Sequence, residues 1–306
     1  MCAERKGRVN LPYFFEPYLV AAQGFVAALD QSGGSTPKAL AAYGVDAKAF
    51  SSDAEMFDMI HAMRSRIVRS SDFTGSKVVG AILFEDTMDR DFDGQPAPQY
   101  LWQQRGVVPF LKVDKGLQDT AEDVQLLKPM PDLDSVLQRA AALGIFGTKM
   151  RSVIHGANRE GISQIVAQQF EIGAQIIAQG LTPILEPEIS ITIAEKPDAE
   201  NILRDTLLSH LDALPADQTV MLKLTLPETA NLYSSLCQHP RVLSVVALSG
   251  GYSRAEANAR LSQNSKMIAS FSRALTEGLS AEQTDAEFDR TLGQTIDEIY
   301  RASIAG

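Results

Sequence analysis

Short apolar runs recur along the chain, and segments with a helical spacing of apolar residues separate them. The runs are rich in Val, Ile, Leu and Phe and end in polar or charged residues, a pattern that predicts buried strands. Eight runs fit this description: Gly24 to Asp30, Val78 to Phe84, Val108 to Asp114, Ile145 to Arg151, Thr182 to Glu188, Val220 to Thr225, Val242 to Ser249, and Met267 to Arg273.

The intervening segments predict helices over Asp53 to Arg69, Leu133 to Leu143, Ile162 to Gln179, Ala199 to Leu214, Glu228 to Cys237 and Ala255 to Asn264. Strands that alternate with helices imply a parallel sheet with right-handed crossovers, and eight repeats are the number that closes a β/α barrel. The predicted fold is therefore an eight-stranded parallel β/α (TIM) barrel.

The 306 residues include no low-complexity tract and no linker rich in Gly, Ser or Pro. We therefore expect a single catalytic barrel domain over 1–306, with an N-terminal extension at 1–20 and a C-terminal helical segment at 275–306. No apolar run is long enough to span a membrane, and the first residues lead into no signal-like stretch. The two cysteines are too few for a disulfide framework, so a cytoplasmic location is expected.

The net charge of −10 argues against a general nucleic-acid binder, although a cleft lined by Lys and Arg could still hold an anionic substrate. The four histidines are scattered, with no H-x-H or H-E-x-x-H spacing, so we expect no catalytic zinc. Neither a G-x-G-x-x-G nor a P-loop motif is present, so a dinucleotide or P-loop site has no support.

Lys223 stands inside the apolar run Met221 to Leu226. An ammonium in such a strand loses much of its hydration, which favours a neutral, nucleophilic amine. Lys223 is therefore a candidate Schiff-base lysine. The alternative is a lysine whose long side chain reaches solvent at the edge of a barrel.

Polar residues end or follow all eight runs: Asp30, Glu85, Lys112, Asp114, Lys149, Arg151, Glu186, Glu188, Lys223, Ser249 and Arg273. The carboxyl ends of barrel strands meet at one face, where the active site of this fold is built. A single polar residue can also simply mark where a strand stops, whereas the whole group of charged strand ends indicates a functional site.

These strand ends supply the charges that imine chemistry requires. The cations Lys149 and Arg151 disfavour a second ammonium at Lys223, and a carboxylate held in a partly apolar pocket can transfer protons. Three carboxylates are candidates: Asp30, Glu186 and Glu188. The alternative for the two glutamates is that they only pair with Lys149 and Arg151.

Two further segments have features of phosphate sites. Ser249-Gly250-Gly251 follows a strand and precedes a helix that begins near Ser253, so backbone N–H groups would point at an anion, and Arg273 would complete this site. The loop Asp30 to Ser35 offers hydroxyls, with Lys112 and Arg151 as cationic partners. Two anion sites around one lysine predict a bisphosphorylated substrate.

At these residues the chain resembles the class I fructose-1,6-bisphosphate aldolases, in particular the shorter bacterial form. The resemblance covers nearly the whole chain in family order, and its most distinctive segments are KVDKG at Lys112 to Gly116 and EPEI at Glu186 to Ile189. The other segments that carry it are Leu29 to Ser35, Lys149 to Arg151, Leu222-Lys223, Leu248 to Gly251 and Ser272 to Leu275.

The resemblance implies roles for individual residues. Lys223 corresponds to the lysine that attacks the C2 ketone, and Glu186 to the principal proton shuttle. Asp30 would orient the substrate hydroxyls, Lys149 would hold Glu186, and Glu188 is a further carboxylate of the catalytic group. Ser249, Gly250 and Arg273 are expected at the C1 phosphate, with Gly251 and Ser272 beside them. The C6 phosphate would face Ser32, Ser35, Lys112 and Arg151.

The resemblance also implies an activity: reversible, metal-independent cleavage of fructose 1,6-bisphosphate to dihydroxyacetone phosphate and glyceraldehyde 3-phosphate, in glycolysis and gluconeogenesis. It implies no cofactor, no nucleic-acid or membrane partner, and leaves a homo-oligomer open. Ser272 departs from the family, where a glycine is usual, and this is expected to alter phosphate contacts without removing them. The chain ends in Ser303-Ile304-Ala305-Gly306 rather than a terminal tyrosine, with Tyr300 in a predicted helix, so another group or solvent should protonate the enamine.

Two alternatives remain at this point. Another Schiff-base barrel enzyme, such as a transaldolase or a deoxyribose-phosphate aldolase, would need only one anion site. A non-catalytic sugar-phosphate-binding protein would have no use for Lys223, Glu186 and Asp30 together. Glu85 and Asp86 are more acidic than an anionic substrate favours, so we expect them to face away from the site.

Overall fold

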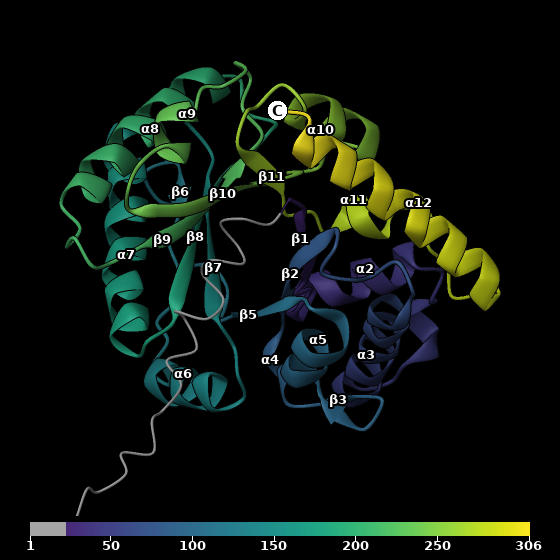
Figure 1. The fold of residues 1–306 in the computed structure, drawn as a ribbon. Helices are drawn as coiled ribbons and strands as arrows, with labels where there is room; N and C mark the ends of the chain where they lie inside the picture. The colour runs from purple at the N-terminus through teal and green to yellow at the C-terminus, as the bar shows by residue number, and fades with distance from the viewer. Residues whose placement is uncertain (1–22) are drawn as a thin grey trace, which may run out of the picture.

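The computed structural model describes residues 23–306, and these form the predicted β/α barrel (Figure 1). The predicted extension at 1–20 lies outside the described residues. Parallel strands neighbour one another in the order β1-β2-β5-β7-β8-β9-β10-β11. Their bounds are β1 Phe25–Leu29, β2 Val78–Leu83, β5 Val108–Lys112, β7 Gly147–Ile154, β8 Thr182–Ile189, β9 Val220–Thr225, β10 Val242–Leu248 and β11 Met267–Ala269.

The last strand returns to the first and nearly closes the barrel. The backbone N–H of Ala28 in β1 donates to the carbonyl oxygen of Phe271, just beyond β11, at 3.1 Å. Two small elements lie beside the barrel: β6 (Val124–Gln125) pairs antiparallel with β7, and β3 (Asp91–Phe92) forms a hairpin with β4 (Gln95–Pro96). Closure leaves few unpaired strand edges and brings the ends of all eight strands to one face.

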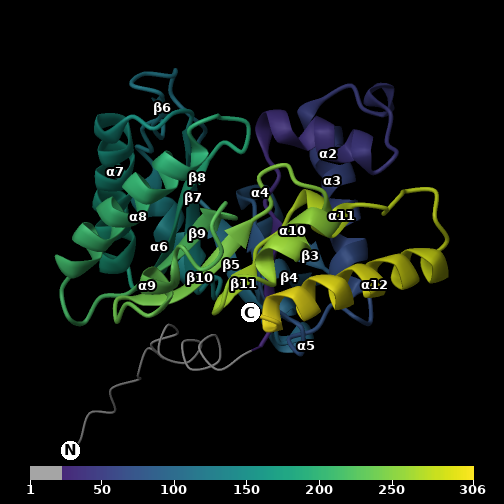
Figure 2. The same cartoon turned by 90° about the horizontal axis from the view of Figure 1, so that it is seen from above.

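Helices surround the strands, and α12 lies along α10 and the closing strand β11 (Figure 2). Each longer helix covers the outer face of the strands next to it. The α-helices are α2 Thr36–Ala42, α3 Asp53–Arg69, α4 Glu85–Met88, α5 Ala97–Arg105, α6 Leu133–Ala142, α7 Arg159–Ala178, α8 Lys196–Asp212, α9 Ser234–Cys237, α10 Arg254–Leu261, α11 Arg273–Thr276 and α12 Asp285–Ile304. Within residues 23–306, no helix combines the length and apolar character needed to cross a membrane.

Several boundaries shift by two or three residues, as in β7, α7 and α8, and two differ in a way that changes an element. Only Ser234–Cys237 of the predicted helix Glu228 to Cys237 is helical, because Asn231 has a φ of 61° and a left-handed residue cannot continue a right-handed helix. The eighth strand ends at Ala269, and Arg273 begins the short helix α11 instead of ending a strand.

Strand alternation divides the apolar residues between two cores. In β1, Phe25, Ala27 and Leu29 belong to the outer core beneath the helices, whereas Val26 and Ala28 belong to the inner core. Side chains two residues apart point to the same face of a strand. The next inward position after Ala28 is therefore Asp30, at the carboxyl end of the barrel.

The same alternation brings charged residues inward on three more strands. Phe110 in β5, Ile184 in β8 and Met221 in β9 all lie in the inner core. Two residues later on these strands come Lys112, Glu186 and Lys223. The inner core is thus apolar at depth and charged at the carboxyl ends of the strands, which we call the barrel mouth.

Candidate active site

A chain of alternating charges crosses the barrel mouth. Lys223 Nζ lies 3.1 Å from Glu186 Oε1, and Glu186 Oε2 lies 3.1 Å from Lys149 Nζ. Lys149 Nζ in turn lies 2.7 Å from Asp30 Oδ2. None of the four residues is more than 9% exposed, so all of them depend on one another for charge compensation.

Glu186 stands between the two lysines with one oxygen facing each. Its Oε1 faces the Lys223 amine, where a proton can pass between them. Its Oε2 is buried, and no group within residues 23–306 makes an aligned hydrogen bond to it, although Lys149 is close. This oxygen therefore has a lone pair to offer to a hydroxyl group of a bound substrate.

The electrostatics keep Asp30 and Lys149 charged. Burial alone would raise the pKa of Asp30, but the attraction of Lys149 and Lys223 outweighs it and holds this pKa well below its ordinary value. Burial alone would lower the pKa of Lys149, whereas the carboxylates around it raise this pKa well above its ordinary value. Lys149 is thus a permanent cation, separated from the nucleophile candidate Lys223 by the carboxylate of Glu186.

Glu188 occupies the next inward position of β8 and pairs with Arg151, whose Nε donates to the Glu188 carboxylate. Burial alone would lower the pKa of Arg151, but Glu188 raises it. Glu186 and Glu188 therefore differ in their surroundings: Glu186 forms ion pairs with two lysines, whereas Glu188 forms an ion pair with one arginine. This pairing is the alternative that the sequence left open for one of the two glutamates.

Asp114 also belongs to this cluster, although the sequence suggested it only as the polar end of a strand. Its Oδ1 lies 2.7 Å from Lys112 Nζ, and its Oδ2 lies 3.8 Å from Lys149 Nζ. Its Oδ2 also accepts a hydrogen bond from the backbone N–H of Arg151 at 3.2 Å. The signal was present in the sequence, because Asp114 follows the inward Lys112 by two residues.

The segment after β10 and the beginning of α11 approach each other at one side of the mouth. Gly250 and Gly251 have φ values of 60° and 125°, which favour glycine. A Cβ atom at Gly250 would lie 2.7 Å from Cγ2 of Ile191, and one at Gly251 would lie 3.5 Å from Nη2 of Arg273. The structure thus brings Arg273 to the Ser249–Gly251 turn, and the helix after this turn begins with Ser253 as its N-cap.

The other predicted anion-binding residues come from three segments. Ser32 caps the short 3-10 helix η1 (Gly33–Ser35) after β1 and Ser35 ends it; the Ser32 N–H donates to Ser35 Oγ at 2.9 Å. Lys112 ends β5, and Arg151 lies in β7. Among the described residues, neither serine forms a hydrogen bond to Lys112 or Arg151, and each of these cations already has a carboxylate partner.

Glu85 and Asp86 are compensated outside this cluster. Glu85 pairs with Lys115 and Arg139, and Asp86 pairs with Arg90. Within residues 23–306, no group of His, Cys, Asp and Glu is arranged to hold a metal ion, and the carboxylates of the mouth alternate with lysines.

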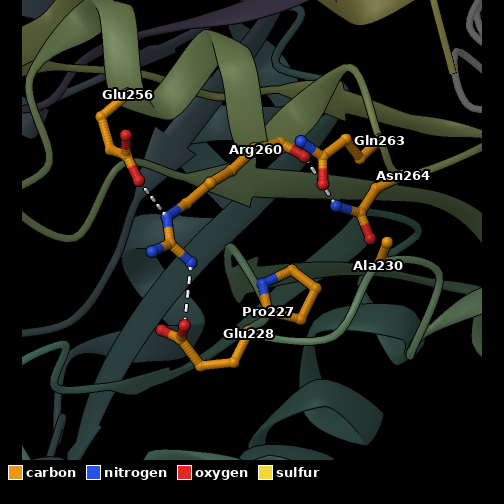
Figure 3. A pocket seen from close by; sticks show the side chains of 7 residues that line it. All are labelled: Pro227, Glu228, Ala230, Glu256, Arg260, Gln263 and Asn264. Carbon is orange, nitrogen blue, oxygen red and sulfur yellow. Dashed lines mark hydrogen bonds and ion pairs between the residues drawn. The ribbon is translucent and has the colours of Figure 1, made fainter.

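A separate recess lies beside the loop after β9 (Figure 3). Arg260 bridges Glu228 at 3.1 Å and Glu256 at 2.7 Å there. Glu228 also accepts from the buried Lys196 at 2.9 Å. These charged groups pair with one another, and the ion pair of Arg260 with Glu228 ties the loop after β9 to α10.

Comparisons with known proteins agree with this geometry. Residues 18–232 match the family model of class I fructose-bisphosphate aldolases. The chain is 60% identical over 281 residues to a class 1 fructose-bisphosphate aldolase of Synechocystis sp., covering 92% of this chain and 94% of the relative. A second relative, the class 1 fructose-bisphosphate aldolase of Porphyromonas gingivalis, is 55% identical over 283 residues, covering 92% and 96%.

A solved structure supports the fold. Fructose-bisphosphate aldolase from Plasmodium falciparum, in complex with TRAP and a small-molecule inhibitor, superposes with a TM-score of 0.76. The superposition covers 100% of this chain and 98% of that one at 20% sequence identity. At this identity the likeness concerns the barrel alone.

Proposed function

The chain belongs to the class I fructose-bisphosphate aldolases, which are lyases, and we propose that it forms the Schiff base of this reaction on Lys223. The single observation that supports Lys223 most is its position: an inward, buried amine lies 3.1 Å from the carboxylate of Glu186. Imine formation needs a nucleophilic amine and a proton donor in contact, and this pair supplies both.

The first half of the proposed reaction builds the imine. The Lys223 amine attacks the C2 ketone of fructose 1,6-bisphosphate and gives a carbinolamine. Glu186 then donates a proton to the C2 hydroxyl, which leaves as water, and the protonated imine remains on Lys223. Lys149, the permanent cation next to Glu186, holds the carboxyl in place and orients the substrate hydroxyls.

The second half breaks the C3–C4 bond. Glu186 accepts the proton of the C4 hydroxyl while the bonding electrons move toward the imine, so an enamine forms on Lys223 and glyceraldehyde 3-phosphate leaves. Asp30, kept ionised by Lys149, orients the substrate hydroxyls during this step. Protonation of the enamine at C3 and hydrolysis of the imine then release dihydroxyacetone phosphate and restore the amine.

We further propose that the two phosphates bind on opposite sides of Lys223. Arg273 and the Ser249–Gly251 turn, with Ser272 beside them, would hold the C1 phosphate. The C6 phosphate would bind near Ser32, Ser35, Lys112 and Arg151, with Glu188 keeping Arg151 in position. The close approach of Arg273 to Gly251 supports the first of these assignments.

Several wider assignments belong to the same proposal. Residues 1–306 would form one catalytic domain that acts on sugar phosphates in the cytoplasm without a metal cofactor, with 275–306 as a C-terminal helical segment. The family is of the Schiff-base, metal-independent type. The electrostatic pairing of every mouth carboxylate with a lysine or arginine agrees with this assignment.

The test is to trap the imine. The protein is incubated with fructose 1,6-bisphosphate, reduced with borohydride and digested, and the modified peptide is located by mass spectrometry. We expect the adduct on Lys223 and full activity in EDTA. Lys196 is an internal control, because it is as buried as Lys223 and also contacts carboxylates, yet lies outside the mouth. An unmodified Lys223, or an adduct on Lys196 instead, would refute the assignment.

A further inference from the structure

Gln31 connects the two proposed phosphate-binding segments. It lies between Asp30 and Ser32, and its Nε2 donates to the Oγ of Ser272 at 2.7 Å, across 241 residues of sequence. Ser272 immediately precedes Arg273. A single side chain therefore joins the loop after β1 to the residue that precedes the arginine proposed for the C1 phosphate.

The buried Arg64 of α3 holds Gln31 in this orientation. Arg64 Nη2 donates to the backbone oxygen of Gln31 at 2.5 Å and to its Oε1 at 3.2 Å, while Nη1 donates to Thr87 Oγ1 at 2.6 Å. Arg64 is completely buried. Burial lowers the pKa of Arg64 to about 10, against the attraction of Asp30, so the guanidinium is still charged at neutral pH.

The chemistry of Arg64 decides which way the Gln31 amide faces. A guanidinium donates hydrogen bonds and accepts none, so the amide oxygen of Gln31 must face Arg64. The amide nitrogen then faces Ser272, whose hydroxyl oxygen must accept. The hydroxyl proton of Ser272 is left to donate elsewhere, and no acceptor within residues 23–306 is hydrogen-bonded to it.

We propose that Arg64, Gln31 and Ser272 form a positioning relay that turns the Ser272 hydroxyl proton toward the phosphate bound by Arg273. Ser272 is then a phosphate ligand, and Gln31 and Arg64 are positioning residues that act through it. This inference rests on the proposed function, because it assumes a phosphate at Arg273.

The relay is tested by kinetics with fructose 1,6-bisphosphate. Gln31→Leu removes the donor of the hydrogen bond between Gln31 and Ser272, and Ser272→Ala removes its acceptor. We expect each variant to raise KM about two- to tenfold, the effect of one hydrogen bond. In Gln31→Leu, kcat should stay within about twofold, since Lys223 and Glu186 are not contacted. Ser272→Thr keeps the hydroxyl and should recover most of the affinity lost in Ser272→Ala.

Coupling distinguishes a relay from two separate effects. The double variant Gln31→Leu/Ser272→Ala should be no worse than the worse single variant, because both remove the same interaction. Gln104→Leu, the same change at an exposed position of α5, is the control and should leave KM unchanged. An unchanged KM in Gln31→Leu, or effects that multiply in the double variant, would overturn the relay.

Two further measurements separate the possible failures. A purely structural contact would lower the unfolding temperature of Gln31→Leu without raising KM, and this result also overturns the relay. If Gln31→Leu does not fold, the comparison of KM between Ser272→Ala and Ser272→Thr still tests whether the Ser272 hydroxyl binds the phosphate. Borohydride trapping is run on every variant: an adduct on Lys223 with unchanged KM refutes only the relay, whereas a wild-type protein without the adduct refutes the proposed function.

Discussion

Asp30→Asn is the substitution that tests the buried charge cluster most directly. It replaces the carboxylate nearest to Lys149 with an amide of almost the same shape, so the expected effect is electrostatic and not a change in packing. Asp30 is ionised in the folded protein, because the attraction of Lys149 and Lys223 outweighs the effect of burial and holds its pKa far below the ordinary value. The variant should therefore lose a favourable interaction that is present throughout the neutral range.

The size of the loss follows from the distances to Lys149 Nζ, which are 2.7 Å for Asp30, 3.1 Å for Glu186 and 3.8 Å for Asp114. At an effective dielectric constant of about 20, these correspond to roughly 6, 5 and 4 kcal/mol of attraction before desolvation is counted. Removing one partner of a buried ion pair costs about 3–5 kcal/mol. Because Glu186 and Asp114 remain, we expect Asp30→Asn to lower the free energy of unfolding by about 3 kcal/mol.

The pH dependence has a definite sign. The pKa of Asp30 is lower in the folded state than the ordinary value of about 3.9 that applies to the unfolded chain. Its contribution to stability is therefore fully present above about pH 4 and is lost as the pH falls through the folded-state pKa. The stability difference between wild type and Asp30→Asn should stay constant between about pH 5 and pH 8 and narrow only in stronger acid.

Urea unfolding followed by circular dichroism at several pH values measures this difference. Asp119→Asn is the control, since Asp119 is exposed and the same change there should alter stability by less than about 0.5 kcal/mol. A destabilisation by Asp30→Asn no larger than that of the control would refute the stabilising interaction between Asp30 and Lys149. A difference that already disappears near pH 6 would show that Asp30 is not ionised at neutral pH.

Three further predictions concern the nucleophile, the turn after β10 and the free thiol. Lys223→Met keeps the side-chain length but removes the amine, so kcat should fall more than about a thousandfold while far-UV circular dichroism is unchanged; residual activity near wild type would contradict the Schiff base on this residue. Gly250→Ala places a methyl group 2.7 Å from Ile191 at a φ of 60°, which should displace the turn proposed to bind the C1 phosphate and raise KM about tenfold. The control is Gly144→Ala, at a φ of 88° with no atom within 4 Å, which adds only backbone strain and should leave KM unchanged. Burial raises the pKa of the Cys237 thiol to about 11, so alkylation at pH 8 should be slow until the protein unfolds, and fast labelling of the native peptide would contradict this burial.

The parts of the fold that depend on local pattern were predictable. Eight apolar runs were identified as strands because a buried strand needs little more than a short apolar run between polar ends, and all eight are confirmed. The predicted helix Glu228 to Cys237 was wrong for most of its length. Its apolar spacing is helical, but Pro227 and the left-handed Asn231 direct the chain around the recess that Arg260 and Glu228 hold together.

The candidate site was predictable to the extent that alternation controls it. Lys223, Glu186 and Asp30 follow inner-core residues by two positions, so their inward direction is a property of each strand alone. The same rule would have found Asp114 after Lys112. The strand pattern alone could not tell which glutamate contacts Lys149 and which neutralises Arg151, because that choice depends on how neighbouring strands are staggered; only the family resemblance assigned Glu186 to Lys149.

The sequence by itself determined the barrel, the direction of each inward side chain and the gathering of charges at one face, because these follow from a period of two residues along each strand and from the number of strands. Only the tertiary structure decided the pairings: Lys149 among three carboxylates, Arg151 with Glu188, and Arg64 with Gln31 and Ser272. The reason is physical. Alternation sets the face on which a residue lies, whereas a hydrogen bond or ion pair requires atoms to lie within a few ångströms of one another, and that separation is set by barrel closure and by the loops that close it.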